Sequence, residues 1–152
     1  ILLGYLAGAV VRGTMVACGI AVGLAVVLQI VPAHPLIALV FIVLGALFLG
    51  GLGIVAGIFA NKFDQMAAIT NFIVTPLAFL SGTFYSINAL PPVLHALAQV
   101  NPVFYLIDGL RFGMIGTSDG APFVGMAICA GASFAICLLA WAMLRSGYRL
   151  KA

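Results

Sequence analysis

Four long apolar runs are the feature that most constrains how this chain can fold. A helix of about 20 apolar residues spans the roughly 30 Å hydrocarbon core of a bilayer. With 65% hydrophobic and only 6% charged residues, the 152 residues lack the polar surface of a soluble domain. The sequence therefore predicts an all-α, polytopic membrane helix bundle that forms one domain, 1–152, with four transmembrane helices at about residues 8–30, 36–59, 66–84 and 121–144.

Prolines and polar residues separate these runs. Val31–Pro35 (VPAHP) holds two prolines and Ala60–Gln65 (ANKFDQ) is polar, which predicts short loops. The segment 85–120 is too long for a simple connection and too apolar for a solvated loop. Because PPVLHALAQV and Asn101-Pro102 within it carry helix-start signals, we expect two short re-entrant or interfacial helices over about 91–115.

The basic residues predict the orientation in the membrane. If the four spans alternate, Arg111 lies on one side and the remaining basic residues lie on the other: Arg12, Lys62, Arg145, Arg149 and Lys151. That second side is expected to be cytoplasmic, with both termini there and the short helices outside. Since the chain starts at Ile1 without a signal-peptide pattern, we also expect it to be a fragment of a longer protein.

The third run carries a stripe of small or polar residues. Asn71, Thr75, Ala78 and Gly82 recur at helical spacing and should face protein or water. Two interpretations are open: ordinary helix packing through Asn and Thr hydrogen bonds, or lining of a substrate path. Pro76 removes a backbone hydrogen bond, so a kink or weak point is expected beside it.

Two further patterns concern contacts between and within helices. Gly19 with Gly23, and Gly53 with Gly57, have the GxxxG spacing that lets membrane helices approach closely, although 18 glycines also produce such spacings by chance. Asp108 and Arg111 stand three residues apart, which predicts a local ion pair on one helix face.

The sequence lacks the motifs of catalysis. It has no phosphate-binding GxxxxGK[ST] loop, no HExxH and no nucleophile elbow, so no catalytic residues are assigned and the chain is not expected to be an enzyme. His34 and His95 have no partner at ligand spacing, and the three cysteines form no CxxC pair, so no metal is assigned. The scattered basic residues exclude a nucleic-acid interface.

The segment NKFDQMAAITNFIVTPLAFLSGTFYSINALPPVLHALAQVNPVFYLIDGLR, Asn61–Arg111, resembles the signature region of ABC-2 type transporter permeases. It combines the FDQ turn, a proline-bearing span, FLSGxFY, an LPP helix start and NPxxYxxDGxR in that family's order. The SGYRLK tail is also similar to that of bacterial exporter permeases, whereas residues 1–60 resemble the family mainly in hydropathy.

The resemblance implies the membrane-spanning permease of an ATP-driven ABC exporter in the bacterial inner membrane. Such a permease moves a hydrophobic or amphipathic compound, such as a drug-like molecule, a lipid or a glycan, out of the cytoplasm. Its implied partners are a cytoplasmic ABC ATPase subunit, which holds the ATP and Mg, a second permease copy and the lipid bilayer. No cofactor is expected on the chain itself, and the family's first two spans would be absent from it.

The resemblance also implies roles for particular residues. A turn that couples to the ATPase would comprise Asn61, Lys62, Phe63, Asp64 and Gln65, for which a turn facing lipid headgroups is the other interpretation. Candidates for lining the path are Asn71, Thr75, Pro76 and Gly82. An outer lid over that path would comprise Pro91, Pro92, Asn101, Pro102, Tyr105, Asp108, Gly109 and Arg111.

A rival interpretation is a passive channel or a structural membrane subunit without an ATPase partner. It is suggested by the absence of any acidic or basic row along the spans. The transported substrate does not follow from the sequence, because a smooth apolar path suits several classes of compound.

Overall fold

The computed structural model describes residues 2–27, 29, 31–60, 62–81 and 91–147. Every regular element in this part of the chain is helical, which confirms the all-α prediction there. The elements are α1 (Leu2–Val27), α2 (Pro35–Phe59), α3 (Phe63–Ile69), the π-helix η1 (Thr70–Val74), α4 (Thr75–Phe79), α5 (Pro92–Val100), α6 (Pro102–Ile115) and α7 (Pro122–Ser146).

Three of the described helices, α1, α2 and α7, are long and apolar enough to cross a membrane. The third predicted span, about 66–84, is not one regular helix. It consists of α3, η1 and α4 in succession, and its last residues, 82–84, lie outside the described residues. The regular hydrogen bonding changes just before Pro76, as expected, because proline has no N–H to donate to the preceding turn. The count of four spans is therefore not confirmed.

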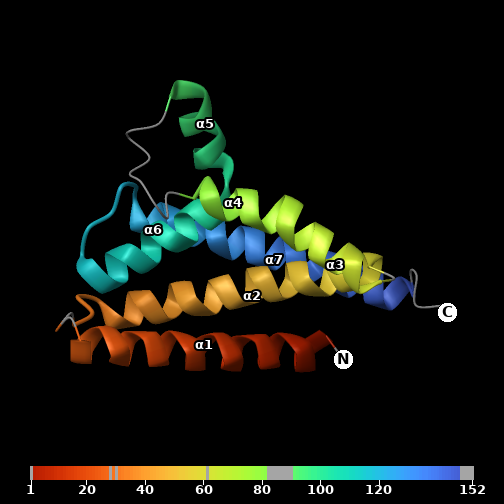
Figure 1. Ribbon diagram of the computed structural model, residues 1–152, viewed down its shortest axis with the longest axis horizontal. Helices are drawn as coiled ribbons and strands as arrows, with labels where there is room; N and C mark the ends of the chain where they lie inside the picture. Colours follow the sequence, from red (N-terminus) through yellow and green to blue (C-terminus); the bar gives the residue numbers. More distant parts are fainter. Residues whose placement is uncertain (1, 28, 30, 61, 82–90, 148–152) are drawn as a thin grey trace.

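The long helices lie side by side, and α1 runs antiparallel to α2 (Figure 1). The bundle has two ends, called the terminal end and the loop end. The terminal end holds the start of α1, the link between α2 and α3 and the end of α7; the loop end holds the link between α1 and α2 and the link between α6 and α7. α3, η1 and α4 return from the terminal end toward the middle, and α5 stands away from the other helices.

α6 covers only half the length of α2. Its 14 residues correspond to about 21 Å of helix, whereas the 25 residues of α2 correspond to about 37 Å. α6 begins near the middle of α2 and runs to the loop end (Figure 1). Together with α5, this half-length helix occupies the range in which two short helices are expected.

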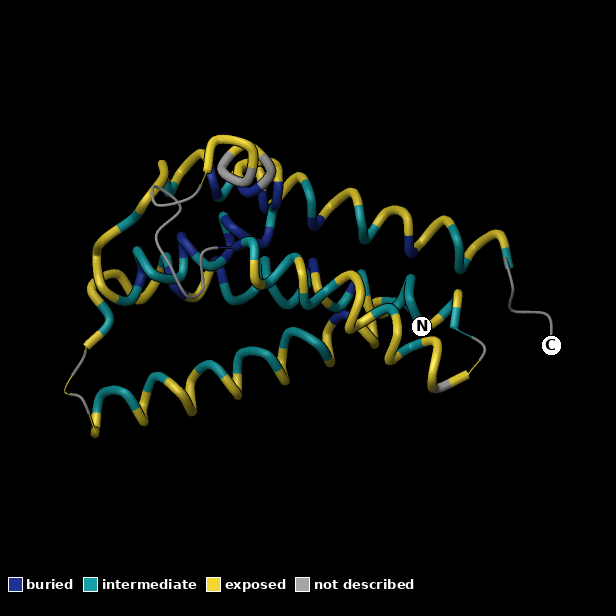
Figure 2. The backbone as a smooth tube through the Cα atoms, turned by 45° about the horizontal axis from the view of Figure 1, so that its top comes forward, coloured by how far each residue is buried: buried dark blue, intermediate teal, exposed yellow. Residues whose placement is uncertain are grey.

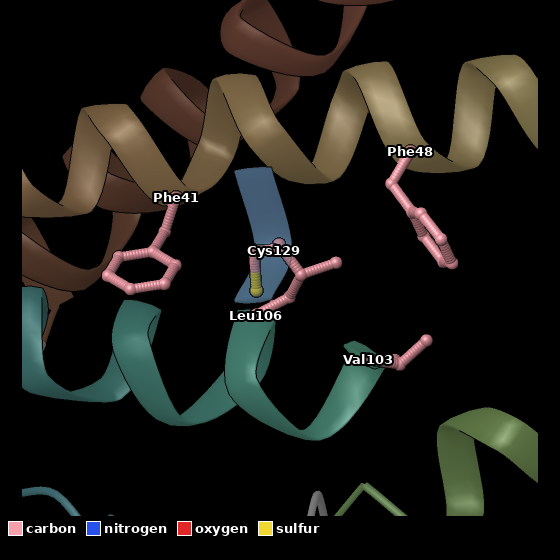
Figure 3. Packing of buried hydrophobic residues seen from close by; sticks show 5 residues of the cluster. All are labelled: Phe41, Phe48, Val103, Leu106 and Cys129. Carbon is pink, nitrogen blue, oxygen red and sulfur yellow. The ribbon is translucent and has the colours of Figure 1, made fainter. Parts of the chain in front are cut away.

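The core lies where α2, α6 and α7 meet. Figure 2 shows buried residues gathered in the interior and exposed residues along the outer sides of the long helices. In Figure 3 the rings of Phe41 and Phe48 extend from α2 toward Val103 and Leu106 of α6, with Cys129 of α7 beside them. These five side chains form one buried cluster, which makes α6 part of the packed interior rather than a surface loop.

Candidate functional site

Two glycines seat α6 directly against α2. A Cβ built on Gly109 would lie 2.2 Å from Cζ of Phe41, and one on Gly113 would lie 2.7 Å from Cβ of Ala38. Residues 109 and 113 have the four-residue spacing of small residues that allows close helix crossings. This pair was not singled out in the sequence, although its spacing is a signal that could have found it.

The two glycine pairs that were singled out behave differently. Nothing lies within 4 Å of a Cβ built on Gly19, Gly23, Gly53 or Gly57. Neither pair therefore brings two helices together within the described part of the chain. Besides the pair Gly109 and Gly113, close approaches come from single glycines such as Gly50, whose built Cβ would lie 2.9 Å from Cβ of Ala9.

Asn101 joins three helices at the start of α6. Its side-chain oxygen accepts from the N–H of Val103 (3.0 Å), so the predicted N-cap is confirmed. Its side-chain amide also donates to the carbonyl of Leu77 on α4 (2.8 Å), a contact that no local pattern could predict. The buried Asn101 thus links α5, α6 and the end of the α3–η1–α4 segment.

The prolines and the tyrosine assigned to the lid have mainly structural positions. Pro91 precedes α5 and Pro92 begins it, while Pro102 begins α6, where a missing N–H costs no helical hydrogen bond. Tyr105 packs against α7 at Gly125: a Cβ atom built on Gly125 would lie only 3.1 Å from the Tyr105 ring.

Asp108 is a buried carboxylate at the loop end, with 3% of its surface exposed. It accepts a hydrogen bond from the hydroxyl of Ser118 (2.6 Å), one from the N–H of Asp119 (2.8 Å) and one from the N–H of Gly120 (3.2 Å). Hydrogen bonds of this kind stabilise a carboxylate that is buried away from solvent. Asp108 therefore holds the loop between α6 and α7 against α6.

The predicted ion pair between Asp108 and Arg111 is wrong. Arg111 instead binds Asp119, with 3.0 Å between Nη1 and Oδ2. The loop 116–121 folds back over α6. Its carboxylate at Asp119 binds Arg111, and two of its backbone N–H groups donate to Asp108. Both side chains of this ion pair are about one-quarter exposed, at 28% and 22%.

The span that carries the path candidates is irregular. Both the backbone N–H and the side-chain hydroxyl of Thr75 donate to the carbonyl of Thr70. The hydroxyl is therefore hydrogen-bonded to the backbone of the π-helix. Asn71 and Pro76 are exposed, whereas Thr75 is half-buried. Gly82, the fourth candidate, lies outside the described residues.

An open apolar groove of about 440 Å³ separates α2 from α3 and η1. A second hollow of about 390 Å³ continues it between α2, α4 and α6, and the two share Leu49, Leu52 and Val74. Neither hollow is lined by Asn71, Thr75 or Pro76. Among the described residues the walls are almost wholly hydrophobic, which suits an acyl chain or another apolar group better than a polar one.

The predicted coupling turn is shorter than the sequence suggested. Asn61 lies outside the described residues, and α3 begins at Phe63, so Asp64 and Gln65 already belong to its first turn. Lys62 and Asp64 are exposed at the terminal end. A carboxylate in the first turn of a helix is electrostatically favourable, which explains why this short connection can begin a helix at once.

Arg12 does not lie at the end of its helix, where the sequence placed it. α1 begins at Leu2 rather than near residue 8, because residues 2–7 (LLGYLA) are apolar and contain no residue that would end the helix. Its neighbours Ala9 and Gly13 contact Gly50 and Ala46 of α2, on either side of that helix's middle. Arg12 is exposed at this height.

Potential ligands for a metal are scattered. Within the described residues, no three His, Cys, Asp or Glu side chains lie close enough to hold an ion. The ring of His34 stacks on the ring of Phe112, with 5.1 Å between ring centroids. The backbone N–H of His34 donates to the backbone carbonyl of Gly113 (2.8 Å). These contacts fasten the α1–α2 link to the end of α6.

Comparisons with known proteins extend the similarity over the whole chain. The family model described as "ABC-2 type transporter" matches residues 1–115. The Inner membrane transport permease YadH of Escherichia coli strain K12 is 32% identical over 152 residues, which cover 99% of this chain and 59% of YadH. Residues 1–60 are therefore similar to the family in more than hydropathy. No solved structure gives a significant match.

Other relatives are shorter matches. Nodulation protein J of Rhizobium leguminosarum bv. trifolii is 31% identical over 116 residues, covering 76% of this chain and 44% of that protein. Nodulation protein J of Rhizobium meliloti strain 1021 is 29% identical over 117 residues, covering 77% and 45%. The chain thus spans about three-fifths of YadH and less than half of the nodulation proteins.

Proposed function

The chain belongs to the ABC-2 type transporter family, and we propose from this premise that it is part of the membrane-spanning permease of an ATP-driven exporter. The cargo would be a hydrophobic or amphipathic compound that leaves the cytoplasm. The observation that carries the proposal is the family match over residues 1–115. Three apolar helices of spanning length agree with it.

In the proposed topology the chain crosses the inner membrane four times, with α3, η1 and α4 as the third crossing. The terminal end faces the cytoplasm and the loop end faces outward, which puts Lys62 and Arg145 inside. α5 and α6 are then the two outer helices, and α6 enters the membrane only halfway. A second copy of the permease completes the path.

The residues Lys62, Asp64 and Gln65, with Asn61 and Phe63, form the proposed contact with a cytoplasmic ABC ATPase subunit that binds ATP and Mg. Phe63, Asp64 and Gln65 begin α3, and α3, η1 and α4 touch the rest of the molecule less than the other long segments do. The hydrogen bond from Asn101 to Leu77 connects the far end of this segment to α6. A change at the turn can therefore reach the proposed lid through one mechanical connection.

The proposed path follows the hollows beside α2, with Asn71, Thr75 and Pro76 on the η1–α4 segment that borders them; Gly82, the fourth proposed residue, lies outside the described residues. The proposed lid consists of the start of α5 and the length of α6. ATP binding can shift such a permease between two states only if the ATPase binds the two states with different affinity. That requirement makes the contact at Asp64 the point to test.

The test uses the full-length protein expressed together with a candidate ABC ATPase subunit from the same organism. We expect the two to purify together and the ATPase rate to change on assembly. Asp64→Lys should weaken the complex without lowering the thermal stability of the permease, whereas Thr117→Lys, at the exposed opposite end, should leave the complex unchanged. A permease that never binds an ATPase, and whose flux ignores ATP, would contradict the proposal and favour a passive channel.

A further inference from the structure

The π-helix η1 (Thr70–Val74) holds one residue more in its turn than an α-helix would. The N–H of Thr75 donates to the carbonyl of Thr70, five residues back, instead of to the carbonyl of Asn71, four residues back. α3 precedes this turn and α4 follows it. Because π-turns inside α-helices are rare and frequently lie at functional sites, this turn is a candidate for a moving part of the proposed permease.

The donors of Thr75 can satisfy an α-helical turn as well as the π-turn. The Thr75 hydroxyl also donates to the carbonyl of Thr70 (3.2 Å), and a threonine hydroxyl can equally bond a carbonyl three or four residues back. In an α-helical turn both donors would therefore bond the carbonyl of Asn71. The hydroxyl of Thr70 donates to the carbonyl of Met66 in α3 (3.0 Å) and would keep that bond. All of these groups belong to residues 66–75, so the pattern is complete within the described chain.

Pro76 favours the π-turn over the α-helical turn. In a continuous α-helix the ring of Pro76 would press on the carbonyl of Phe72, four residues back, and that carbonyl would receive no N–H. The π-turn directly before the proline interrupts that helix. The hydrogen bonds of Thr75 thus permit both forms while Pro76 favours one, and a partner that binds α3 better in the other form can shift the balance.

Conversion of the π-turn to an α-helical turn rotates α3. An α-helix advances by about 100° and 1.5 Å per residue, so with α4 fixed the conversion turns α3 by about 100° and moves it by about 1.5 Å. Each residue of α3 then takes the place that the preceding residue held. α4 is held by Asn101, whose side-chain amide donates to the carbonyl of Leu77 (2.8 Å).

This rotation changes which side chains line the groove beside α2. Five residues form its wall on the side of α3 and η1: Met66, Ile69, Thr70, Ile73 and Val74. In the α form Ala67 takes the place of Met66, and Asn71 takes the place of Thr70. The amide of Asn71 both donates and accepts hydrogen bonds, so the apolar groove gains a group that can bind the polar part of an amphipathic cargo.

We propose that η1 is a register switch whose conversion from π-helix to α-helix turns Asn71 into the groove beside α2. This inference rests on the proposed export function and deepens it, because Asn71 then lines the path in only one of two states. α3 carries Asp64 and Gln65 in its first turn, so the same rotation moves the proposed ATPase contact. An ATPase that binds the two rotations with different affinity shifts the switch.

Cysteine cross-linking in the full-length permease, in a variant without other cysteines, measures the rotation. The first pair is Gly53→Cys with Asn71→Cys; Gly53 lines the groove, and a Cβ built there meets nothing within 4 Å. The reference pair is Leu49→Cys with Leu77→Cys, which joins α2 to α4 across the adjoining hollow. A short bis-methanethiosulfonate reagent links each pair, and the readout is the rate of the first pair divided by the rate of the reference pair.

Variants at the turn assign this ratio to the rotation. Pro76→Ala supplies the missing N–H and should raise the ratio at least about tenfold, because a proline inside an α-helix is disfavoured by more than a tenfold change in population requires. Pro76→Ser supplies the same N–H and should act alike. The matched control combines Pro76→Ala with deletion of Phe72, which removes one residue from the turn. The helix is then regular while α3 keeps its facing, so the ratio should stay at the value found with Pro76 in place.

The permease with Pro76 in place gives a measurement without any change at the turn. In its complex with the ATPase, addition of ATP should raise the ratio, because the switch then follows the nucleotide. Cross-linking of the reference pair at its usual rate shows that each protein is folded.

Three results would overturn the inference. The first is a ratio that neither Pro76→Ala nor Pro76→Ser changes, and the second is a ratio that ATP leaves unchanged in the complex. The third is an equal rise in the deletion control, which would mean that straightening of the helix brings Asn71 to α2 without rotation. The turn variants need no ATPase, so an unchanged ratio in a permease that binds its ATPase rejects this inference alone. The expected changes in a permease that binds no ATPase reject only the export proposal.

Discussion

At the scale of single residues, Asp108 shows how one buried carboxylate can hold a loop. Replacing it by Asn leaves at least one of the three donors without an acceptor and points an NH₂ group toward a backbone N–H group. Hydrogen bonds to charged groups contribute about 1.5–3 kcal/mol each, so we expect Asp108→Asn to lower the free energy of unfolding by about 2 kcal/mol. Titration with sodium dodecyl sulfate measures it.

The control for Asp108→Asn is Asp64→Asn, because Asp64 is exposed and should change stability by less than about 0.5 kcal/mol. Hydrogen exchange adds a local measurement. The amides of Asp119 and Gly120 should exchange faster in Asp108→Asn only. Equal effects of the two substitutions would show that the loop does not depend on this carboxylate.

The ion pair between Arg111 and Asp119 gives a second prediction at this scale. In a double-mutant cycle of Arg111→Gln and Asp119→Asn, we expect a coupling energy of about 0.5–1 kcal/mol, because both groups are partly exposed. The coupling should fall as salt is raised. A cycle of equal size and salt dependence between Arg111 and Asp64, at opposite ends of the bundle, would contradict this assignment.

These residues show what local sequence can and cannot reveal. The cap at Asn101 was predictable because its partner, Val103, is two residues away. The partners of Asp108 were not, because they lie ten to twelve residues later in a loop whose path depends on how α7 packs. The helical spacing therefore predicted an ion pair between Asp108 and Arg111, the nearest opposite charge, and this prediction was wrong.

At the scale of elements, the seating of α6 depends on the absence of a side chain at residue 109. Gly109→Ala would place Cβ 2.2 Å from the ring of Phe41, and overpacking of a dense core costs about 1–3 kcal/mol. Gly19→Ala is the matched control, since nothing lies within 4 Å of that position and alanine favours a helix by up to about 1 kcal/mol. Detergent unfolding should show destabilisation only for Gly109→Ala.

The same contact can be tested by restoring space. Phe41→Leu together with Gly109→Ala should be less destabilising than the sum of the two single changes, because the smaller side chain vacates part of the ring's position. Strict additivity would place the strain of Gly109→Ala somewhere other than Phe41.

The π-helix is the second element whose behaviour can be predicted. Pro76→Ala supplies the N–H that the regular helix lacks, so we expect η1 to become α-helical and its amides to exchange at least about tenfold more slowly. Pro122→Ala, at the first position of α7, is the control, because no helical acceptor awaits that N–H. Unchanged exchange in Pro76→Ala would mean that the threonines, rather than the proline, maintain the π-helix.

Element boundaries were predictable where the chain has strong punctuation and not elsewhere. Prolines marked the starts of α2, α5, α6 and α7 to within a few residues. The start of α1 was misplaced because residues 1–7 (ILLGYLA) contain no proline, charged residue or helix cap that would mark a boundary. That error hid the position of Arg12, which is exposed beside the middle of α2 rather than at a helix end.

At the scale of the whole molecule, the described helices include a tightly packed block and a loosely attached segment. α2, α6 and α7 share the core, and Ser133 of α7 donates to the carbonyl of Leu44 on α2 (3.0 Å). α3, η1 and α4 border the apolar hollows and reach α6 through Asn101. A movement that opens the proposed path beside α2 therefore needs to displace only this segment.

The proposed topology makes the last prediction. Single cysteines replacing Lys62 and Thr117, in a variant without the three native cysteines, should react with a membrane-impermeant maleimide from opposite sides, because these exposed positions lie at the terminal end and the loop end. In intact cells Thr117→Cys should be labelled and Lys62→Cys only after lysis. Labelling of both in intact cells would contradict an odd number of crossings between them and would remove α3, η1 and α4 as a third span.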